Sequence, residues 1–406
     1  MTVLVVAAGA AVNAMASDPA KPTAKSSVKS ATKSTVAYNP VAFAELPGWE
    51  QDDHMVAFKA FRKSCDRLLA ARERAGGDKG EPVLVAACQA GIALTKPTKA
   101  GAKAFFERNF TANALSHDGP PGLLTGYYEP VIEGSRTAQG VFQTPIYRRP
   151  TDLVNLVDET KRLAAGSALS HARKTDKGVE PFATRAEIDQ GVLKGRNLEL
   201  MYFADPVDVF FMQIQGSGRV KLTDGSMVRV HYDGKNGHPY SSIGRYLIEK
   251  GIVAADKMSM DALAKWLKSD LERAKQIMWQ NASYVFFREL KGEEAKGPLG
   301  AMNAPLTAGR SLAVDTLYHA LGTPIYVTAG AANAGGKARP FHRLMIAQDV
   351  GSAIRGPERG DIYFGSGDAA GELAGSTKRG GNFIVLTPKE APLRAATEAR
   401  SQEAKQ

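Results

Sequence analysis

Three aspartates lie within one short C-terminal stretch, and their neighbours suggest acid chemistry. Asp361 directly precedes the apolar run 362–364, which is typical of a half-buried strand. Desolvation beside such a strand raises the pKa of a carboxyl group and keeps its proton available near neutral pH. Asp349 and Asp368 are the other two candidates. The alternative is that all three accept backbone hydrogen bonds in turns, because Asp beside Gly is common in turns.

A carboxylic acid of this kind is suited to breaking a glycosidic bond. The acid protonates the leaving oxygen, and most hydrolases add a second carboxylate that attacks the sugar or activates water. Asp349 and Asp361 could form such a pair. Asp349 also precedes a Val-Gly step, so it could instead orient the loop that follows.

Three segments combine aromatic rings with planar polar groups, at residues 125–130, 213–219 and 231–237. Sugars are bound by this mixture, because ring faces pack on pyranose C–H surfaces while amides and hydroxyls pair with sugar hydroxyls. Alternatively, the tyrosines fill core positions and the glycines form turns. The candidate substrate-binding residues are Thr125, Gly126, Tyr127, Tyr128, Gln213, Gln215, Gly216, Ser217 and Gly218.

Other kinds of chemistry lack the residues they need. The seven histidines are scattered, with no His-x-x-x-His pair, so we expect no metal site and no cofactor. No phosphate-binding Gly-x-x-x-x-Gly-Lys motif occurs, and residues 215–218 lack the spacing of a nucleophile elbow. Nucleotide chemistry and serine catalysis are therefore disfavoured.

The elements that must hold these residues are mostly helical at first and mostly strands later. Helical spacing of apolar residues predicts helices over 55–71, 82–94 and 100–110, and again over 243–250 and 258–278. Short apolar runs between turn residues predict strands at 198–203, 209–214 and 228–232. Six further strands are predicted at 284–287, 311–314, 324–327, 344–346, 361–364 and 382–386.

The fold class predicted is mainly β with α. Six short strands separated by Gly-rich turns suit a small closed barrel, because closure removes exposed edges. We predict that residues 39–130 and 283–390 form this barrel domain with its N-terminal helices. Residues 131–282 have their own strands and helices and are predicted to be an inserted β domain.

Both ends of the chain differ from its middle in composition. Residues 3–16 are apolar and end in Ala14-Met15-Ala16, the form of an export cleavage site, so 1–16 is read as a signal peptide. Residues 17–38 and 391–406 are polar and predicted to be a disordered tether and tail. In an exported protein Cys65 and Cys88 could form a disulfide or remain buried thiols. The 52 basic and 42 acidic side chains give a net charge of +10, which favours acidic partners.

The longer motifs resemble a known family, the membrane-bound lytic murein transglycosylases A. The resemblance covers most of 123–386, through residues 124–130, 210–220 and 236–240 and the aspartate-rich segment, which is similar to the family's three-aspartate (3D) module. It implies a double-psi β-barrel domain with a smaller inserted β domain and a glycan groove between them. It also implies a periplasmic or cell-envelope location, although no cysteine follows the apolar run to carry a lipid anchor.

The resemblance further implies the reaction and the partners. Asp361 aligns with a single acid/base, Asp349 with a supporting aspartate and Asp368 with the third, least defined position. The family cleaves the β-1,4 bond between N-acetylmuramic acid and N-acetylglucosamine and leaves a 1,6-anhydromuramoyl end. We therefore expect a monomer acting on peptidoglycan glycan strands, with no nucleic acid partner and a weak association with anionic membrane surfaces through the Lys-rich tether. A non-catalytic wall-binding protein is the alternative.

Overall fold

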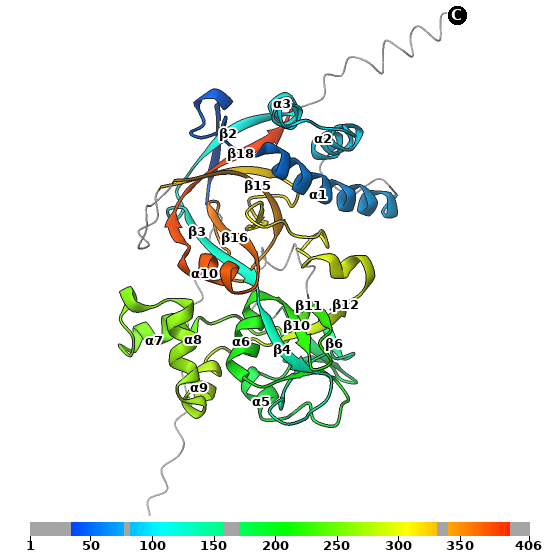
Figure 1. Ribbon diagram of the computed structural model, residues 1–406, viewed down its shortest axis with the longest axis vertical. Coiled ribbons are helices and arrows are strands. Elements are labelled where there is room, and N and C mark those ends of the chain that lie inside the picture. The colour runs from blue at the N-terminus through cyan, green and yellow to red at the C-terminus, as the bar shows by residue number, and fades with distance from the viewer. Residues whose placement is uncertain (1–33, 77–81, 157–169, 331–339, 390–406) are drawn as a thin grey trace, which may run out of the picture. The chain divides into compact units, whose positions relative to one another are not determined.

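The computed structural model describes residues 34–76, 82–156, 170–330 and 340–389 (Figure 1). The expected signal peptide at 1–16 and tail at 391–406 lie outside the described residues, as does most of the expected tether at 17–38. The tether prediction is wrong for residues 36–38, because β1 (Val36–Val41) pairs antiparallel with β2 (Phe110–His117) and this ladder offsets the ordering cost. Within the described ranges, no helix is long and apolar enough to cross a membrane.

A nine-stranded mixed sheet among the described residues joins three strands between residues 36 and 129 to six strands between residues 311 and 388. Its order among the described residues is β1-β2-β18-β14-β15-β13-β16-β3-β17. No ladder joins the two edge strands within this part of the chain, so closure into a double-psi barrel stays a prediction. The other bounds are β3 (Leu123–Glu129), β13 (Ser311–Ala313), β14 (Pro324–Ala329), β15 (Phe341–Asp349), β16 (Arg359–Ser366), β17 (Lys378–Gly380) and β18 (Asn382–Pro388).

Three helices pack against this sheet near β15 and β18 (Figure 1). They are α1 (His54–Arg74), α2 (Pro82–Ala93) and α3 (Lys99–Asn109), close to the ranges predicted from apolar periodicity. Their inner faces form one core with strand residues such as Tyr326 and Ile346. Phe58, Phe61 and Phe106 are fully buried there in edge-to-face contacts.

A disulfide between Cys65 and Cys88 joins α1 to α2 and settles the alternative left open by the sequence. The two cysteines are 23 residues apart, so the bond restricts the unfolded chain. We expect the double variant C65A/C88A to lose about 3 kcal/mol of unfolding free energy in urea titrations. Wild type measured under reducing conditions is the matched control and should show the same loss. Equal stability of the variant and the oxidised wild type would contradict the prediction.

A second sheet contains six strands among the described residues, in the order β12-β11-β10-β4-β9-β5. The bounds are β4 (Val131–Ser135), β5 (Thr144–Tyr147), β9 (Glu199–Phe203), β10 (Ser217–Leu222), β11 (Met227–Lys235) and β12 (Val285–Leu290). A three-stranded sheet of β6 (Leu153–Asn155), β7 (His171–Thr175) and β8 (Gly178–Glu180) adjoins it in sequence. The domain boundary predicted at residue 283 is too early, because β12 pairs with β11 and not with the larger sheet.

The segment predicted as a strand at 209–214 is a helix, α6 (Pro206–Gln215). Its Val and Phe residues favour strands, but local capping and packing override that propensity. Asp205 caps the N-terminus, Pro206 occupies the first turn and Gly216 ends the helix with a φ of 78°. The helix is largely apolar because it packs into two cores, with Phe210 in one and Met212 in the other.

The remaining helices are short. The single helix predicted at 258–278 is two, α8 (Met260–Lys268) and α9 (Leu271–Met278), because Asp270 breaks the run and caps α9. The helix predicted at 243–250 is confirmed as α7 (Ile243–Glu249). Among the described residues the others are α5 (Arg185–Asp189), α10 (Asp368–Ser376) and 3-10 turns at Phe43–Glu45, Ala255–Lys257 and Gly292–Lys296.

The chain passes from the larger to the smaller sheet between β3 and β4, and a buried ion pair marks this crossing. Glu129 is fully buried at the end of β3. Its carboxylate accepts from Arg229 of β11 at 2.5 and 3.0 Å and from the Ser366 hydroxyl of β16 at 2.5 Å. Three donors thus compensate for the burial of this charge and tie both sheets to one residue.

Candidate active site

The ladder pairing brings Asp349 and Asp361 to the same place in the larger sheet. Strand β13 lies between β15 and β16, and its last residue, Ala313, is opposite Asp349 on one side and Asp361 on the other. Thr125 of β3 is opposite Asp361 on the next strand. Two strand spacings place the Cα atoms of the two aspartates roughly 10 Å apart. The sheet therefore sets out a row of functional side chains across four strands.

A break in register selects Asp349 for this row. Ser311 is opposite Ile346 and Leu312 is opposite Ala347, so an unbroken parallel register would place Gln348 beside Ala313. The irregularity between Leu312 and Ala313 advances the pairing by one residue. Bulges of this kind commonly re-aim a side chain next to an active site.

Both oxygens of Asp349 have hydrogen-bond partners. The Tyr127 hydroxyl donates to Oδ2 at 2.8 Å. The backbone N–H groups of Ala301 and Val350 donate to Oδ1 at 3.1 and 2.9 Å. Burial raises the pKa of Asp349 to about 6, although these three donors act in the opposite direction. The carboxyl is therefore fixed in position and titrates near neutral pH.

Asp361 is held at one oxygen only. The Thr125 hydroxyl donates to Oδ1 at 2.5 Å, and Arg359 in turn donates to the Thr125 oxygen at 2.9 Å. Among the described residues Oδ2 has no hydrogen-bond partner, and it is not one of the buried unpartnered atoms, so it opens to the cavity that Asp361 lines. Burial raises the pKa of Asp361, partly opposed by the Thr125 hydrogen bond and by Arg359. This is the environment expected for a carboxyl that gives up a proton.

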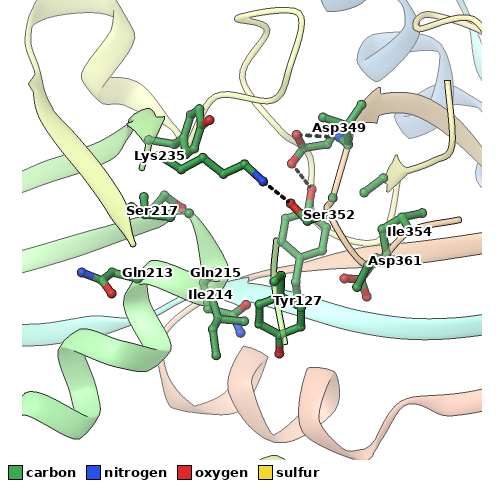
Figure 2. Close-up of a pocket in the computed structure, with 18 of the residues that line it drawn as sticks. Tyr127, Gln213, Ile214, Gln215, Ser217, Lys235, Asp349, Ser352, Ile354 and Asp361 are labelled. Atoms are coloured by element: carbon green, nitrogen blue, oxygen red, sulfur yellow. Dashed lines mark hydrogen bonds between the residues drawn. The ribbon is translucent and has the colours of Figure 1, made fainter. Parts of the chain in front are cut away.

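The two aspartates lie at one side of a cavity of about 300 Å³ (Figure 2). The larger sheet contributes Tyr127, Ala313 and the aspartates. Gln213, Gln215, Gly216 and Ser217 line it from α6 and β10, and Figure 2 shows Gln213 on the side opposite Asp361. Lys235 of β11 reaches across and donates to the Ser352 hydroxyl at 3.3 Å. Side chains from both sheets therefore enclose the space.

Four of the residues predicted to bind substrate do not line this cavity. Thr125 supports Asp361, as described above. The backbone N–H of Tyr128 donates to Gln215 Oε1 at 3.0 Å, which joins β3 to the end of α6. Gly126 and Gly218 allow close packing: a Cβ would lie 2.6 Å from the Phe364 ring at Gly126 and 2.4 Å from Met212 Sδ at Gly218. Asp368 is exposed as the first residue of α10 and does not line the cavity.

The small side chain of Ala313 leaves the floor between the aspartates open. We expect Ala313→Val to lower kcat/KM on a glycan substrate by at least about tenfold, because the added methyls occupy space between the carboxyls. Overpacking should cost only about 1–3 kcal/mol of unfolding free energy. Ala329→Val is the matched control, since Ala329 is equally buried in β14 but does not line the cavity. An active Ala313→Val enzyme would show that substrate does not reach this floor.

Two family models match the chain. The MltA specific insert domain matches residues 123–288 and the 3D domain matches residues 310–387. Membrane-bound lytic murein transglycosylase A of Vibrio cholerae is 35% identical over 277 residues, which is 67% of this chain and 67% of that protein. The chain belongs to the membrane-bound lytic murein transglycosylase A family. The Escherichia coli K12 member is 37% identical over 273 residues, 66% of each chain.

Solved structures of family members have the same fold. A membrane-bound lytic murein transglycosylase from Agrobacterium tumefaciens aligns with a TM-score of 0.76 at 35% identity, covering 87% of this chain and 98% of that one. MltA from Neisseria gonorrhoeae gives 0.71 at 33% identity, covering 88% and 95%. E. coli MltA with bound chitohexaose gives 0.61 at 29% identity, covering 87% and 92%.

The family domains divide the site between them. The 3D domain supplies Asp349 and Asp361, and the MltA insert domain supplies Tyr127 and the α6 residues. Sequence reasoning missed Arg359 and Ala313, and it included Lys235 only as part of segment 231–237, without naming it as a candidate. The position of Arg359, two residues before Asp361, could have indicated that it lies near the acid. Ala313 is recognisable only from the strand register.

Proposed function

We propose that this protein is a peptidoglycan lytic transglycosylase. It cleaves the β-1,4 bond between N-acetylmuramic acid and N-acetylglucosamine and forms a 1,6-anhydromuramoyl end. The observation that carries the proposal is the difference between the two carboxyls. Asp361 has a raised pKa and an oxygen open to the cavity, while both oxygens of Asp349 are engaged. One carboxyl is thus available for proton transfer.

Asp361 acts first as acid and then as base. Its proton passes to the glycosidic oxygen as the C1–O4 bond breaks and N-acetylglucosamine leaves. The resulting carboxylate takes the proton of the muramoyl C6 hydroxyl, and O6 bonds to C1. Atoms balance without water, and Asp361 ends protonated as it began. Because the nucleophile belongs to the substrate, proximity replaces a water-activating carboxylate.

Asp349 supports this reaction by its charge and position. With a pKa of about 6 it is ionised for much of the time near neutral pH. A carboxylate fixed by three donors stabilises the positive charge that develops at C1 without needing to reorganise. Tyr127 lines the cavity and holds Asp349 in place, because its hydroxyl donates to Oδ2 and its ring lies against buried Tyr363 with centroids 5.3 Å apart.

The cavity suits a glycan strand in the cell envelope. Aromatic rings, amides and hydroxyls line it, as expected for sugar recognition. The E. coli relative binds chitohexaose, a chain of related sugars. The proposal requires no cofactor, and among the described residues no cluster of His, Cys, Asp and Glu could hold a metal. It retains the expectation of a monomer acting on peptidoglycan.

Digestion of purified sacculi tests the proposal. Mass spectrometry of the fragments should find anhydromuramoyl ends, with no ¹⁸O incorporated from labelled water. Reducing ends carrying ¹⁸O would instead identify a hydrolase that uses Asp349 and Asp361 as a pair. Binding to sacculi without release of fragments would support the wall-binding alternative.

A further inference from the structure

The buried guanidinium of Arg185 lines the same cavity as the two aspartates, although it is far from them in sequence. Arg185 of α5 is only 3% exposed. Its Nε and Nη2 donate to the backbone carbonyls of Asn281 and Ser283 at 3.2 and 2.7 Å. Its planar face lies over the rings of Phe210 and Tyr284, at 4.7 and 5.2 Å from the centroids. These contacts fix the guanidinium plane and leave Nη1 without a hydrogen-bond partner among the described residues.

The charge of Arg185 is not neutralised by an ion pair. No carboxylate lies within ion-pair distance of it in the described part of the chain. Asp189, one turn further along α5, interacts favourably with it from a distance but accepts a hydrogen bond from Trp279 at 3.0 Å. Burying an unpaired cation is costly, so such a group usually has a partner. None of the described residues supplies such a partner, and the cavity is the open direction.

A second polar group beside the same space is also unsatisfied. Gln213 of α6 is 3% exposed and lines the cavity. Neither its Oε1 nor its Nε2 has a hydrogen-bond partner among the described residues. The Tyr284 hydroxyl interacts with Gln213 weakly, without the geometry of a hydrogen bond. A buried amide without hydrogen-bond partners is unfavourable unless a ligand satisfies it.

We infer that Arg185 and Gln213 form an anion subsite that binds a carboxylate of the muramoyl residue. This inference rests on the proposed function and adds a recognition element to it. Gln213, one of its two residues, lies on the side of the cavity opposite Asp361 (Figure 2). Nη1 donates a charge-assisted hydrogen bond to the carboxylate, and Gln213 Nε2 supplies a second donor. The subsite distinguishes muramoyl units, which carry a lactyl acid, from N-acetylglucosamine units, which carry none.

Two carboxylates of the substrate have the required chemistry. In strands without stem peptides the lactyl group itself ends in a carboxylate. In intact peptidoglycan that group is an amide, and carboxylates of the stem peptide are nearest. Both present the same planar anion to a guanidinium, so binding measurements with each form distinguish the source.

Binding should be measured by calorimetry on an Asp361→Asn background, so that ligands remain intact. The ligands are stem-free glycan fragments, the same fragments with the lactyl acid converted to a neutral amide, fragments that keep their stems, and chitohexaose. We expect amidation of the stem-free fragment to weaken binding by tenfold or more. Arg185→Gln and Gln213→Leu should weaken the carboxylate forms to a similar extent and change chitohexaose binding less than threefold.

A control variant and a stability measurement make the binding test of the anion subsite decisive. Arg136→Gln is the matched control, since Arg136 is an exposed arginine of the same domain that pairs with Glu289 and does not line the cavity. Gln213→Leu removes unsatisfied atoms, so its melting temperature should not fall even if Arg185→Gln unfolds. Equal affinity of wild type for the acid and amide forms would overturn the inference. If anhydro ends form but the acid and amide forms bind equally, the proposed reaction is retained and the anion subsite is rejected. If the acid form binds more tightly but hydrolytic ends form, the anion subsite is retained and the proposed reaction is rejected.

Discussion

Asp361→Asn should lower the rate of fragment release from sacculi by about 10³-fold or more. A positioned acid or base contributes roughly 10² to 10⁴-fold, and this one carboxyl serves in both roles. The fold should be retained, because the asparagine oxygen still accepts the Thr125 hydroxyl that Asp361 accepts at 2.5 Å. Initial rates of anhydromuropeptide release, with a thermal melt of each protein, provide the measurement.

Asp368→Asn is the control for this prediction. Asp368 belongs to the same aspartate-rich segment but is exposed at the start of α10 and does not line the cavity. The control removes one acidic charge a few residues away, and its rate should stay within about twofold of wild type. A comparable loss in both variants, or an active Asp361→Asn enzyme, would remove Asp361 from the mechanism.

Asp349→Asn should make the protein slower but more stable above pH 6. The pKa of Asp349 is raised from 3.8 to about 6, so the folded state binds the proton more tightly than the unfolded state. Wild type therefore loses stability as the pH rises from about 4 through 6, by roughly 3 kcal/mol at the upper end. Asparagine does not ionise and avoids this loss, and its amide can still pair with Ala301, Val350 and Tyr127.

Urea titrations at pH 4 and pH 7.5 test the sign of this effect. The variant should exceed wild type by about 2–3 kcal/mol at pH 7.5 and by much less at pH 4, after allowing for one weakened contact to Tyr127. Fragment release should fall by about 10²-fold, as for the loss of a fixed charge near the reacting carbon. A variant less stable than wild type at pH 7.5 would show that Asp349 is needed as a structural anion.

The aspartates could be found from the sequence because each stands beside a strand pattern that the structure contains. Asp361 was predicted at the start of such a strand and lies within β16, beside apolar residues that desolvate it. The pairing of Asp349 with the same site could only be guessed. It depends on a register shift between β13 and β15. An extra residue in one strand of a ladder does not change the alternation of side chains that a sequence pattern can detect.

The error at α6 has a different cause. Residues 209–214 carry mostly β-branched and aromatic side chains. A helix that packs into two cores has apolar residues on more than one side, and this weakens the helical period in the sequence. The sequence nevertheless carries signals for both ends of this helix: Asp205-Pro206 at its start and Gly216 at its end. Because Gln213 was placed on a strand, its proximity to Arg185 could not be inferred. That proximity depends on the packing of α5 and α6, which local patterns do not encode.

The shared position of Ala313 between Asp349 and Asp361 makes the spacing of the two carboxyls a property of the sheet. Loops around the cavity can lengthen, shorten or change composition without moving either group, because backbone ladders fix the distance across β15, β13 and β16. Loss of the register shift itself, with Gln348 retained, would act differently. It would present the Gln348 amide, which now binds Ser311, Ala60 and Ser64 in the core, in place of the carboxylate. The site is thus tolerant of insertions at its rim and intolerant of a change of strand register in its floor.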